Sequence, residues 1–154
     1  MMRRFFTVFL FAACAAAQGR PDFTGSWKQD NARSTLRPGS TIVYSNRIEQ
    51  DGVKLRVTTI LGATADRKES TYSRDYSIGG PATTSSDREG DQFTNTVKWE
   101  GDSLVFETVE KEKSGTLTTR EFWTLSADGK TLTKKIHRSG PRGDSDQTFV
   151  LQKQ

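Results

Sequence analysis

Phe23-Thr24-Gly25-Ser26-Trp27-Lys28 is the stretch of this sequence that decides the fold. It follows directly on a segment with the features of a secretory leader, so it lies where a mature chain would begin. The Gly-x-Trp step within it falls on an expected first β-strand over residues 22–29. The interpretation of this stretch therefore depends on the segment that precedes it and on the pattern of strands that follows it.

Residues 1–17 have the three parts of a secretory signal peptide. A cationic head, Met1-Met2-Arg3-Arg4, precedes an apolar run over residues 5–13, and Ala15-Ala16-Ala17 supplies the small residues that a signal peptidase accepts. The apolar run is shorter than the roughly 20 residues that a membrane-spanning helix needs. The sequence therefore predicts a cleaved leader rather than a transmembrane helix.

Cleavage is expected after Ala17, which predicts an exported domain over residues 18–154, in the periplasm or outside the cell. Two alternatives stay open. The leader could remain as a short membrane anchor. It could also direct lipid attachment to Cys14, because Leu10-Phe11-Ala12-Ala13-Cys14 loosely resembles a lipobox.

Residues 18–154 are sufficient for one domain. Their formal net charge is +2, because the leader holds two of the arginines behind the overall +4 and no acid. Charges of both signs are interleaved, as in Lys111-Glu112-Lys113, which is typical of a solvated surface and argues against a nucleic-acid partner. The only cysteine lies in the leader, so the mature domain forms no disulfide and depends on its core and its hydrogen-bonded sheet.

The pattern behind the leader is that of an all-β domain. Threonine is abundant, no segment has a sustained helical stripe, and several segments alternate apolar with polar residues. Tight turns are expected at Asp51-Gly52, Glu100-Gly101-Asp102 and Asp128-Gly129. The predicted fold is a single antiparallel up-and-down β-barrel of about 8–9 strands, with a two-sheet β-sandwich as the alternative. The expected strands cover residues 22–29, 41–50, 53–61, 67–78, 92–100, 103–112, 116–126, 130–138 and 146–153.

Two segments are not expected to form strands. Residues 30–40 contain Pro38-Gly39 and predict a loop with one helical turn over residues 31–35. Residues 79–91 contain Gly79-Gly80-Pro81 followed by a polar run, which predicts a turn or a mobile loop.

Strand alternation places three cations, Arg74, Lys134 and Arg138, on faces that are otherwise apolar. An unpaired buried cation is destabilising, so each of them needs an anion, water or an open end of the barrel. The functional interpretation is an interior that binds an amphipathic anion, with cations at its head group and aromatic rings at its tail. The predicted ligand-binding residues are Tyr44, Tyr72, Arg74, Tyr76, Trp99, Phe106, Lys134 and Arg138.

Three structural explanations of these cations also stay open. The side chains could extend from strand ends into solvent. They could pair with Glu107, Glu121 or Asp75. A shift of the strand register by one residue would instead turn them to the outer face.

The mature domain offers few residues for catalysis. It has no cysteine, no Gly-x-Ser-x-Gly elbow and a single histidine, His137, which we expect to be a surface or structural residue, with haem ligation as an alternative. One histidine cannot supply a usual zinc site, and Gly143-Asp144-Ser145-Asp146 falls short of a calcium loop. No metal or cofactor is predicted, and paired carboxylates remain the one enzymatic option.

Phe23-x-Gly25-x-Trp27-Lys28 resembles the first strand of the lipocalin and fatty-acid-binding-protein superfamily, the calycins. Val97-Lys98-Trp99-Glu100-Gly101-Asp102-Ser103-Leu104-Val105 resembles a hairpin of the fatty-acid-binding proteins. The whole chain is similar to small exported bacterial proteins described as lipocalin-like. The resemblance implies a β-barrel that Gly25 and Trp27 close at one end, with Arg120 or Arg138 against the tryptophan.

The sequence also departs from these families. Residues 30–40 are too few for the two helices that fatty-acid-binding proteins insert after the first strand. The C-terminal helix and the disulfides that lipocalins often carry are not visible either.

The leading hypothesis is an exported, non-catalytic protein that holds a small apolar or amphipathic molecule, which could be anionic, inside its barrel. No nucleic-acid partner and no membrane span in the mature chain are expected. One alternative is a filled barrel that serves as a structural or protein-interaction module of the cell envelope. The other is an enzyme that depends on carboxylates.

Overall fold

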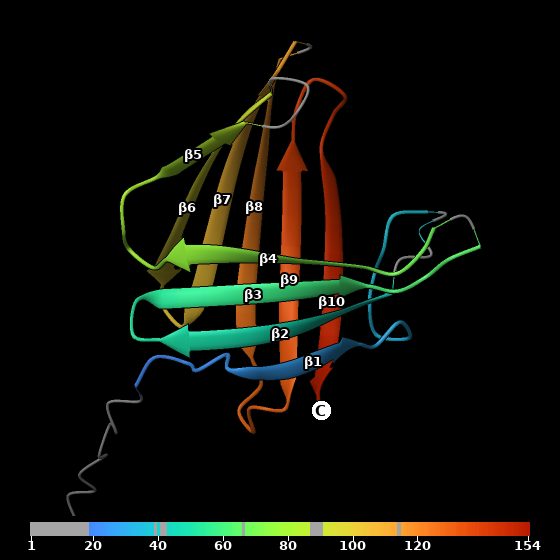
Figure 1. Ribbon diagram of the computed structural model, residues 1–154, viewed down its shortest axis with the longest axis vertical. Helices are drawn as coiled ribbons and strands as arrows, with labels where there is room; N and C mark the ends of the chain where they lie inside the picture. The colour runs from blue at the N-terminus through green and yellow to red at the C-terminus, as the bar shows by residue number, and fades with distance from the viewer. Residues whose placement is uncertain (1–18, 39, 41–42, 66, 87–90, 114) are drawn as a thin grey trace, which may run out of the picture.

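The computed structural model describes residues 19–154 apart from 39, 41–42, 66, 87–90 and 114 (Figure 1). The predicted leader, with its cleavage site at Ala17 and the alternative lipid site at Cys14, lies outside the described residues. The described residues form ten strands and no helix, so none of them belongs to a helix that could span a membrane. The strands are β1 Gly25–Gln29, β2 Tyr44–Asp51, β3 Lys54–Leu61, β4 Ser70–Ser77, β5 Thr83–Ser86, β6 Gln92–Glu100, β7 Ser103–Glu112, β8 Gly115–Leu125, β9 Thr131–Ser139 and β10 Ser145–Lys153.

All ten strands belong to one antiparallel sheet, with the order β4-β3-β2-β1-β10-β9-β8-β7-β6-β5. Strands that follow one another in the sequence are neighbours in the sheet, except β4 and β5, which form its two ends. The first strand, β1, pairs with the last, β10. Figure 1 shows the sheet curling, so that β1–β4 run across the direction of β6–β10. This confirms the predicted up-and-down β-barrel, because a β-sandwich would have two sheets.

The barrel wall is not closed by a continuous ladder between β4 and β5. Each of these strands has a single hydrogen-bonded neighbour, β3 and β6 respectively. After β4 the chain crosses to β6 through an isolated bridge between Ile78 and Val97, where the Gly79 N–H donates to the Val97 carbonyl at 2.7 Å. One bridge therefore connects the two sides of the wall, and beyond it no hydrogen-bonded ladder joins β4 to β5.

The three predicted tight turns connect β2 to β3, β6 to β7 and β8 to β9. Gly101 in the second of them has a φ of 59°, a conformation that glycine adopts without a Cβ clash. All nine predicted strands are present within a few residues of their expected ends. The tenth strand, β5, lies inside residues 79–91, so the prediction of a turn or loop throughout that segment was wrong.

The segment between β1 and β2 is a loop with a turn over residues 31–33, which agrees with the prediction for residues 30–40. The Asp30 carboxylate accepts the N–H groups of Ala32 and Arg33 at 3.1 and 3.3 Å and holds the chain in a turn. Thr35 then pairs with Thr148 of β10, and each residue donates its N–H to the carbonyl of the other. This backbone pairing satisfies the polar groups of Thr35 and attaches the loop to β10.

The end of the barrel around β1 is filled with aromatic side chains. Trp27 is fully buried, and its Nε1 donates to the Phe23 carbonyl at 2.9 Å. The Phe23 ring stacks on Trp99 at 6.0 Å between centroids and meets the edge of Trp123 at 5.8 Å. Trp27 thus belongs to the core at this end, as its resemblance to the first calycin strand implied.

The cation against Trp27 is not the predicted arginine. Lys153 of β10 lies over the ring, with its Nζ 5.4 Å from the centroid. Arg120 lies on the outer face with Glu100 and Phe122, and Arg138 lines the cavity described below, so the prediction of either residue was wrong. Gly25, in the same strand as Trp27, has a φ of 147°, which residues with a side chain rarely adopt, and a Cβ there would also approach Lys153 Cε to 2.8 Å.

Candidate ligand-binding cavity

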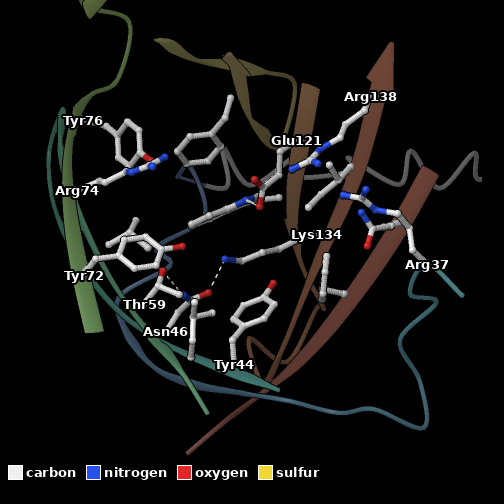
Figure 2. A pocket seen from close by; sticks show the side chains of 17 residues that line it. Arg37, Tyr44, Asn46, Thr59, Tyr72, Arg74, Tyr76, Glu121, Lys134 and Arg138 are labelled. Carbon is white, nitrogen blue, oxygen red and sulfur yellow. Dashed lines mark hydrogen bonds between the residues drawn. The ribbon is translucent and has the colours of Figure 1, made fainter. Parts of the chain in front are cut away.

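A cavity of about 310 Å³ lies inside the curled sheet, and Trp123 both lines it and contacts Phe23 of the filled end (Figure 2). Seven strands and the segment between β1 and β2 contribute to its wall, so it is a property of the whole barrel. The lining residues are Arg37, Tyr44, Asn46, Val57, Thr59, Leu61, Tyr72, Arg74, Tyr76, Phe106, Glu121, Trp123, Lys134, Ile136, Arg138, Gln147 and Phe149.

Strand alternation points these side chains inward. On β9, Lys134 is buried and lines the cavity with Ile136 and Arg138, whereas Lys135 between them is exposed. Of the eight residues predicted to bind a ligand, seven line the cavity: Tyr44, Tyr72, Arg74, Tyr76, Phe106, Lys134 and Arg138. Trp99 is placed elsewhere, in the filled end of the barrel, where it stacks on Phe23 and has the Arg20 guanidinium 5.2 Å from its ring centroid.

Lys134 connects opposite walls of the barrel. Its side chain is 3% exposed, and its Nζ donates to Asn46 Oδ1 at 2.5 Å, while Asn46 Nδ2 donates to Thr59 Oγ1 at 2.9 Å. Figure 2 shows this chain of hydrogen bonds running from β9 to β2 and β3. Nζ also lies 3.7 Å from the centroid of the Trp123 ring. The ammonium is therefore held by one amide oxygen and an aromatic face.

Burial lowers the pKa of Lys134 to about 8, although the charge of Glu121 acts to raise it. Glu121 is the one carboxylate among the described residues of the cavity wall. Its Oε1 accepts a 2.6 Å hydrogen bond from Trp123 Nε1, which orients both side chains. Cations thus dominate the charge of the described cavity wall, since four cationic side chains accompany this single acid: Arg37, Arg74, Lys134 and Arg138.

Arg138 is the half-buried cation of the wall. Its Nε is shielded from solvent and has no hydrogen-bond partner among the described residues. Burial is the main factor that lowers the pKa of Arg138, and the charge of Arg37 adds to it, while Glu110 and Glu121 act in the opposite direction. Figure 2 shows Arg37 and Arg138 on the same side of the cavity. A buried donor without an acceptor is destabilising, and an acceptor placed on this side of the cavity would satisfy it.

Arg74 and Tyr72 form the more open side, on the edge strand β4. Both side chains are exposed, and the Arg74 guanidinium lies 5.6 Å from the centroid of the Tyr72 ring. Tyr76 lies deeper, packs edge-on against Phe106 at 5.1 Å and has a pKa that burial raises. A second hollow of about 420 Å³ shares Arg74 and Tyr76 and continues between β4 and β5–β6, where the wall is open.

Tyr44 completes the aromatic lining at the deep side. Its ring packs edge-on against Phe149 at 4.9 Å, and burial is the main factor that raises its pKa well above the usual range, so its hydroxyl stays neutral. The wall thus combines aromatic surface with cations and neutral hydroxyl and amide groups. Such a mixture suits a ligand with a charged or polar head and an apolar body.

Five polar residues of the wall were not among the predicted ligand-binding residues: Arg37, Asn46, Thr59, Glu121 and Gln147. Asn46 had a usable signal, since it alternates with Tyr44 and Ile48 on one strand. Glu121 had the same signal through Trp123, two residues away. Arg37 lies outside the strands, so no periodicity marks it.

The other candidate sites lie on the outside of the barrel. His137 Nδ1 and Asp146 Oδ1 are 2.8 Å apart, with side chains that are 45% and 81% exposed, so His137 is a surface residue as predicted. In the part of the chain that the structure describes, no group of three or more histidine, cysteine or acidic side chains could hold a metal ion. The described cavity wall has no second carboxylate beside Glu121, which leaves paired-carboxylate hydrolysis without a partner there.

Searches against protein-family models and curated protein sequences find no match. Solved structures do match. The zebrafish ileal bile-acid-binding protein complexed with cholic acid is 16% identical, with a TM-score of 0.59 over 86% of this chain and 98% of that one. The Schistosoma mansoni fatty-acid-binding protein in complex with arachidonic acid is 15% identical, with a TM-score of 0.58 over 86% and 96%. Secretory abundant heat soluble protein 4 from Ramazzottius varieornatus is 14% identical, with a TM-score of 0.62 over 88% and 96%.

These likenesses define the fold. The chain has the calycin-type β-barrel of the fatty-acid-binding proteins, as its first strand indicated, and it spans nearly the whole length of each of these neighbours. Its segment between β1 and β2 differs from the helical lid of fatty-acid-binding proteins, because its described residues form a turn and a bridge.

Proposed function

We propose that this protein binds a small amphipathic anion, a carboxylate or similar head group with an apolar body, inside its barrel. The observation that carries the proposal is the solvent-shielded Arg138 Nε without a partner, in a wall that holds four cations and a single acid. An anionic head group would supply the missing acceptor and balance the charge. Charge-assisted hydrogen bonds to arginine are among the stronger polar contacts in proteins.

Two of the similar structures support this choice of ligand class. The zebrafish protein is complexed with cholic acid and the Schistosoma mansoni protein with arachidonic acid, and both ligands are amphipathic acids. The fold alone does not carry their binding residues to this chain at identities of 16% and 15%. The residues of this wall are therefore what favours an anionic ligand.

The head group would lie toward Arg138 and Arg37, with the apolar body against Trp123, Phe106 and Ile136. A volume of about 310 Å³ lies at the lower end of small-molecule sites, which span about 300–1,000 Å³. A longer body would extend past Arg74 and Tyr76 into the hollow between β4 and β5–β6. We therefore expect the protein to bind both medium-length and long acyl ligands.

Displacement of a fluorescent fatty-acid analogue by octanoate, dodecanoate and dodecanol tests the proposal. Arg138→Gln removes the positive charge and should weaken carboxylate binding by about 10- to 100-fold, the equivalent of one hydrogen bond to a charged group. Arg47→Gln is the matched control, because Arg47 is an exposed arginine outside the cavity that pairs with Glu49. Dodecanol should bind both variants alike. Equal carboxylate affinity of the two variants would refute an anion site at Arg138.

We also propose that the protein is exported, on the strength of the leader over residues 1–17. The mature chain isolated from its source should begin just after Ala17. N-terminal sequencing or intact-mass measurement tests this. A chain that retains Met1 would contradict export by cleavage, and a lipid mass on Cys14 would establish the lipoprotein alternative.

A further inference from the structure

Lys134 is an amine enclosed in an aromatic chamber of the cavity. Its Nζ lies 3.7 Å from the centroid of Trp123 and 5.6 Å from that of Tyr44. An ammonium has three N–H donors, and in the described structure one of them reaches an acceptor, Asn46 Oδ1. No carboxylate forms a salt bridge with Nζ among the described residues.

The surroundings lower the pKa of this amine. Desolvation disfavours a buried ammonium, and Glu121 on β8 is the acid that opposes this effect. With a pKa of about 8, a share of the molecules carries a neutral and therefore nucleophilic amine at neutral pH. The titratable groups of the wall around it are Glu121 of β8, Tyr44 of β2, Tyr72, Arg74 and Tyr76 of β4, Arg138 of β9 and Arg37 of the preceding segment.

We propose that Lys134 captures apolar aldehydes reversibly as a Schiff base inside the cavity, an inference that rests on the proposed function because the same cavity must admit the ligand. The amine nitrogen forms a bond to the carbonyl carbon. The carbonyl oxygen then leaves as water with the two amine protons, and a C=N bond replaces the C=O bond. No oxidant, reductant or further reactant is needed.

An aldehyde should react more favourably with Lys134 in the cavity than with an exposed lysine on the surface. Its neutral carbonyl adds no second charge beside Lys134, and its apolar chain would pack on Trp123, Phe106 and Tyr44. Limited access of water favours the imine, because imine formation releases water. Lys135, the next residue of β9, is exposed and has none of these features, so it serves as an internal reference.

The test is to incubate the purified protein with octanal and sodium cyanoborohydride, which reduces an imine to a stable secondary amine. Peptide mass spectrometry should locate one octyl group on Lys134, with a rate that rises through about pH 8. Lys134→Arg keeps the charge and should abolish this adduct, whereas Lys135→Arg should leave it unchanged. Octanoate should slow labelling of Lys134 by competing for the cavity.

The outcomes separate this inference from the proposed function. If octanoate binds and displaces a fluorescent probe, but octanal labels the lysines in order of their exposure, Schiff-base capture at Lys134 is wrong and anion binding stands. If octanoate does not bind and Lys134 is not labelled, both proposals fail. Should Lys134→Arg not fold, the peptide map of the unmodified sequence still decides between these results.

Discussion

Trp27 shows what a single buried residue contributes to this barrel. It is fully buried, donates to the Phe23 carbonyl and lies under Lys153, so its removal leaves a cavity, an unpaired carbonyl and an exposed apolar surface at once. Trp27→Ala should lower the free energy of unfolding by about 3–5 kcal/mol. Urea unfolding followed by far-UV circular dichroism measures this change.

Val53→Ala is the control for Trp27→Ala. Val53 is 60% exposed, and its truncation should change stability by less than about 0.5 kcal/mol. A Trp27→Ala variant as stable as this control would show that the tryptophan does not hold the closed end of the barrel together.

Lys134 makes the stability of the protein depend on pH in a specific direction. Its pKa is about 8 in the folded state and 10.5 when unperturbed, so between these values the unfolded state binds more protons than the folded state. Stability should therefore rise as the pH increases through this window, by on the order of 3 kcal/mol at most. Below about pH 8 both states are protonated, and the destabilisation is fully present.

Comparison with Lys134→Met isolates this effect. Above about pH 10, tyrosines of the unfolded chain ionise while burial keeps Tyr44 neutral, which acts in the opposite direction. Both proteins share that contribution, so the difference between their unfolding free energies should follow Lys134 alone. A difference that stays constant from about pH 7 to about pH 10 would contradict the buried, desolvated ammonium.

At the scale of the elements, β4 and β5 are the least supported strands. Each pairs on one side only, and their residues are almost all exposed, whereas β7 and β8 have partners on both sides. The amides of β4 and β5 should therefore exchange with deuterium faster than those of β7 and β8. Hydrogen exchange monitored by mass spectrometry tests this, and equal protection of β5 and β8 would mean that the gap is closed in solution.

The composition of β5 explains why the sequence did not predict this strand. Thr83–Ser86 has no apolar residue and four exposed side chains, so the alternation that marked the other nine strands is missing. Its strand form comes from pairing with Asn95, Thr94, Phe93 and Gln92 of β6. A strand that exists through backbone pairing with its neighbour alone leaves little trace in its own sequence.

The cavity residues divide in the same way. Tyr72, Arg74 and Lys134 were predictable because strand period alone decides which face they share. Trp99 has the same period but lies nearer the end that Phe23 fills, and position along a strand axis has no periodic signal. The same is true of Lys153, which replaced the expected arginines over Trp27 because β10 pairs with β1.

For the molecule as a whole, a ligand in the cavity should stabilise the fold. Residues from seven strands line the cavity, so the binding site exists only in the folded barrel. A bound carboxylate at 100 times its dissociation constant should add about 2.7 kcal/mol to the unfolding free energy. Thermal unfolding with and without dodecanoate measures this.

Arg138→Gln serves as the control in the same thermal experiment. It should lose most of this stabilisation at equal ligand concentration, because its weaker affinity reduces the occupancy of the site. A melting temperature that dodecanoate leaves unchanged in the unmodified protein would count against a binding cavity of any kind.

The pairing of β1 with β10 also affects how the molecule is made. These are the first and last of the ten strands, and they meet in register from Trp27 opposite Lys153 to Gln29 opposite Leu151. During synthesis, one edge of β1 therefore waits for its neighbour until the rest of the domain has left the ribosome. Contacts so distant in sequence are slow to form. Until β10 arrives, the nascent chain carries an open strand edge that other chains could pair with, so chaperones would be needed most at that stage.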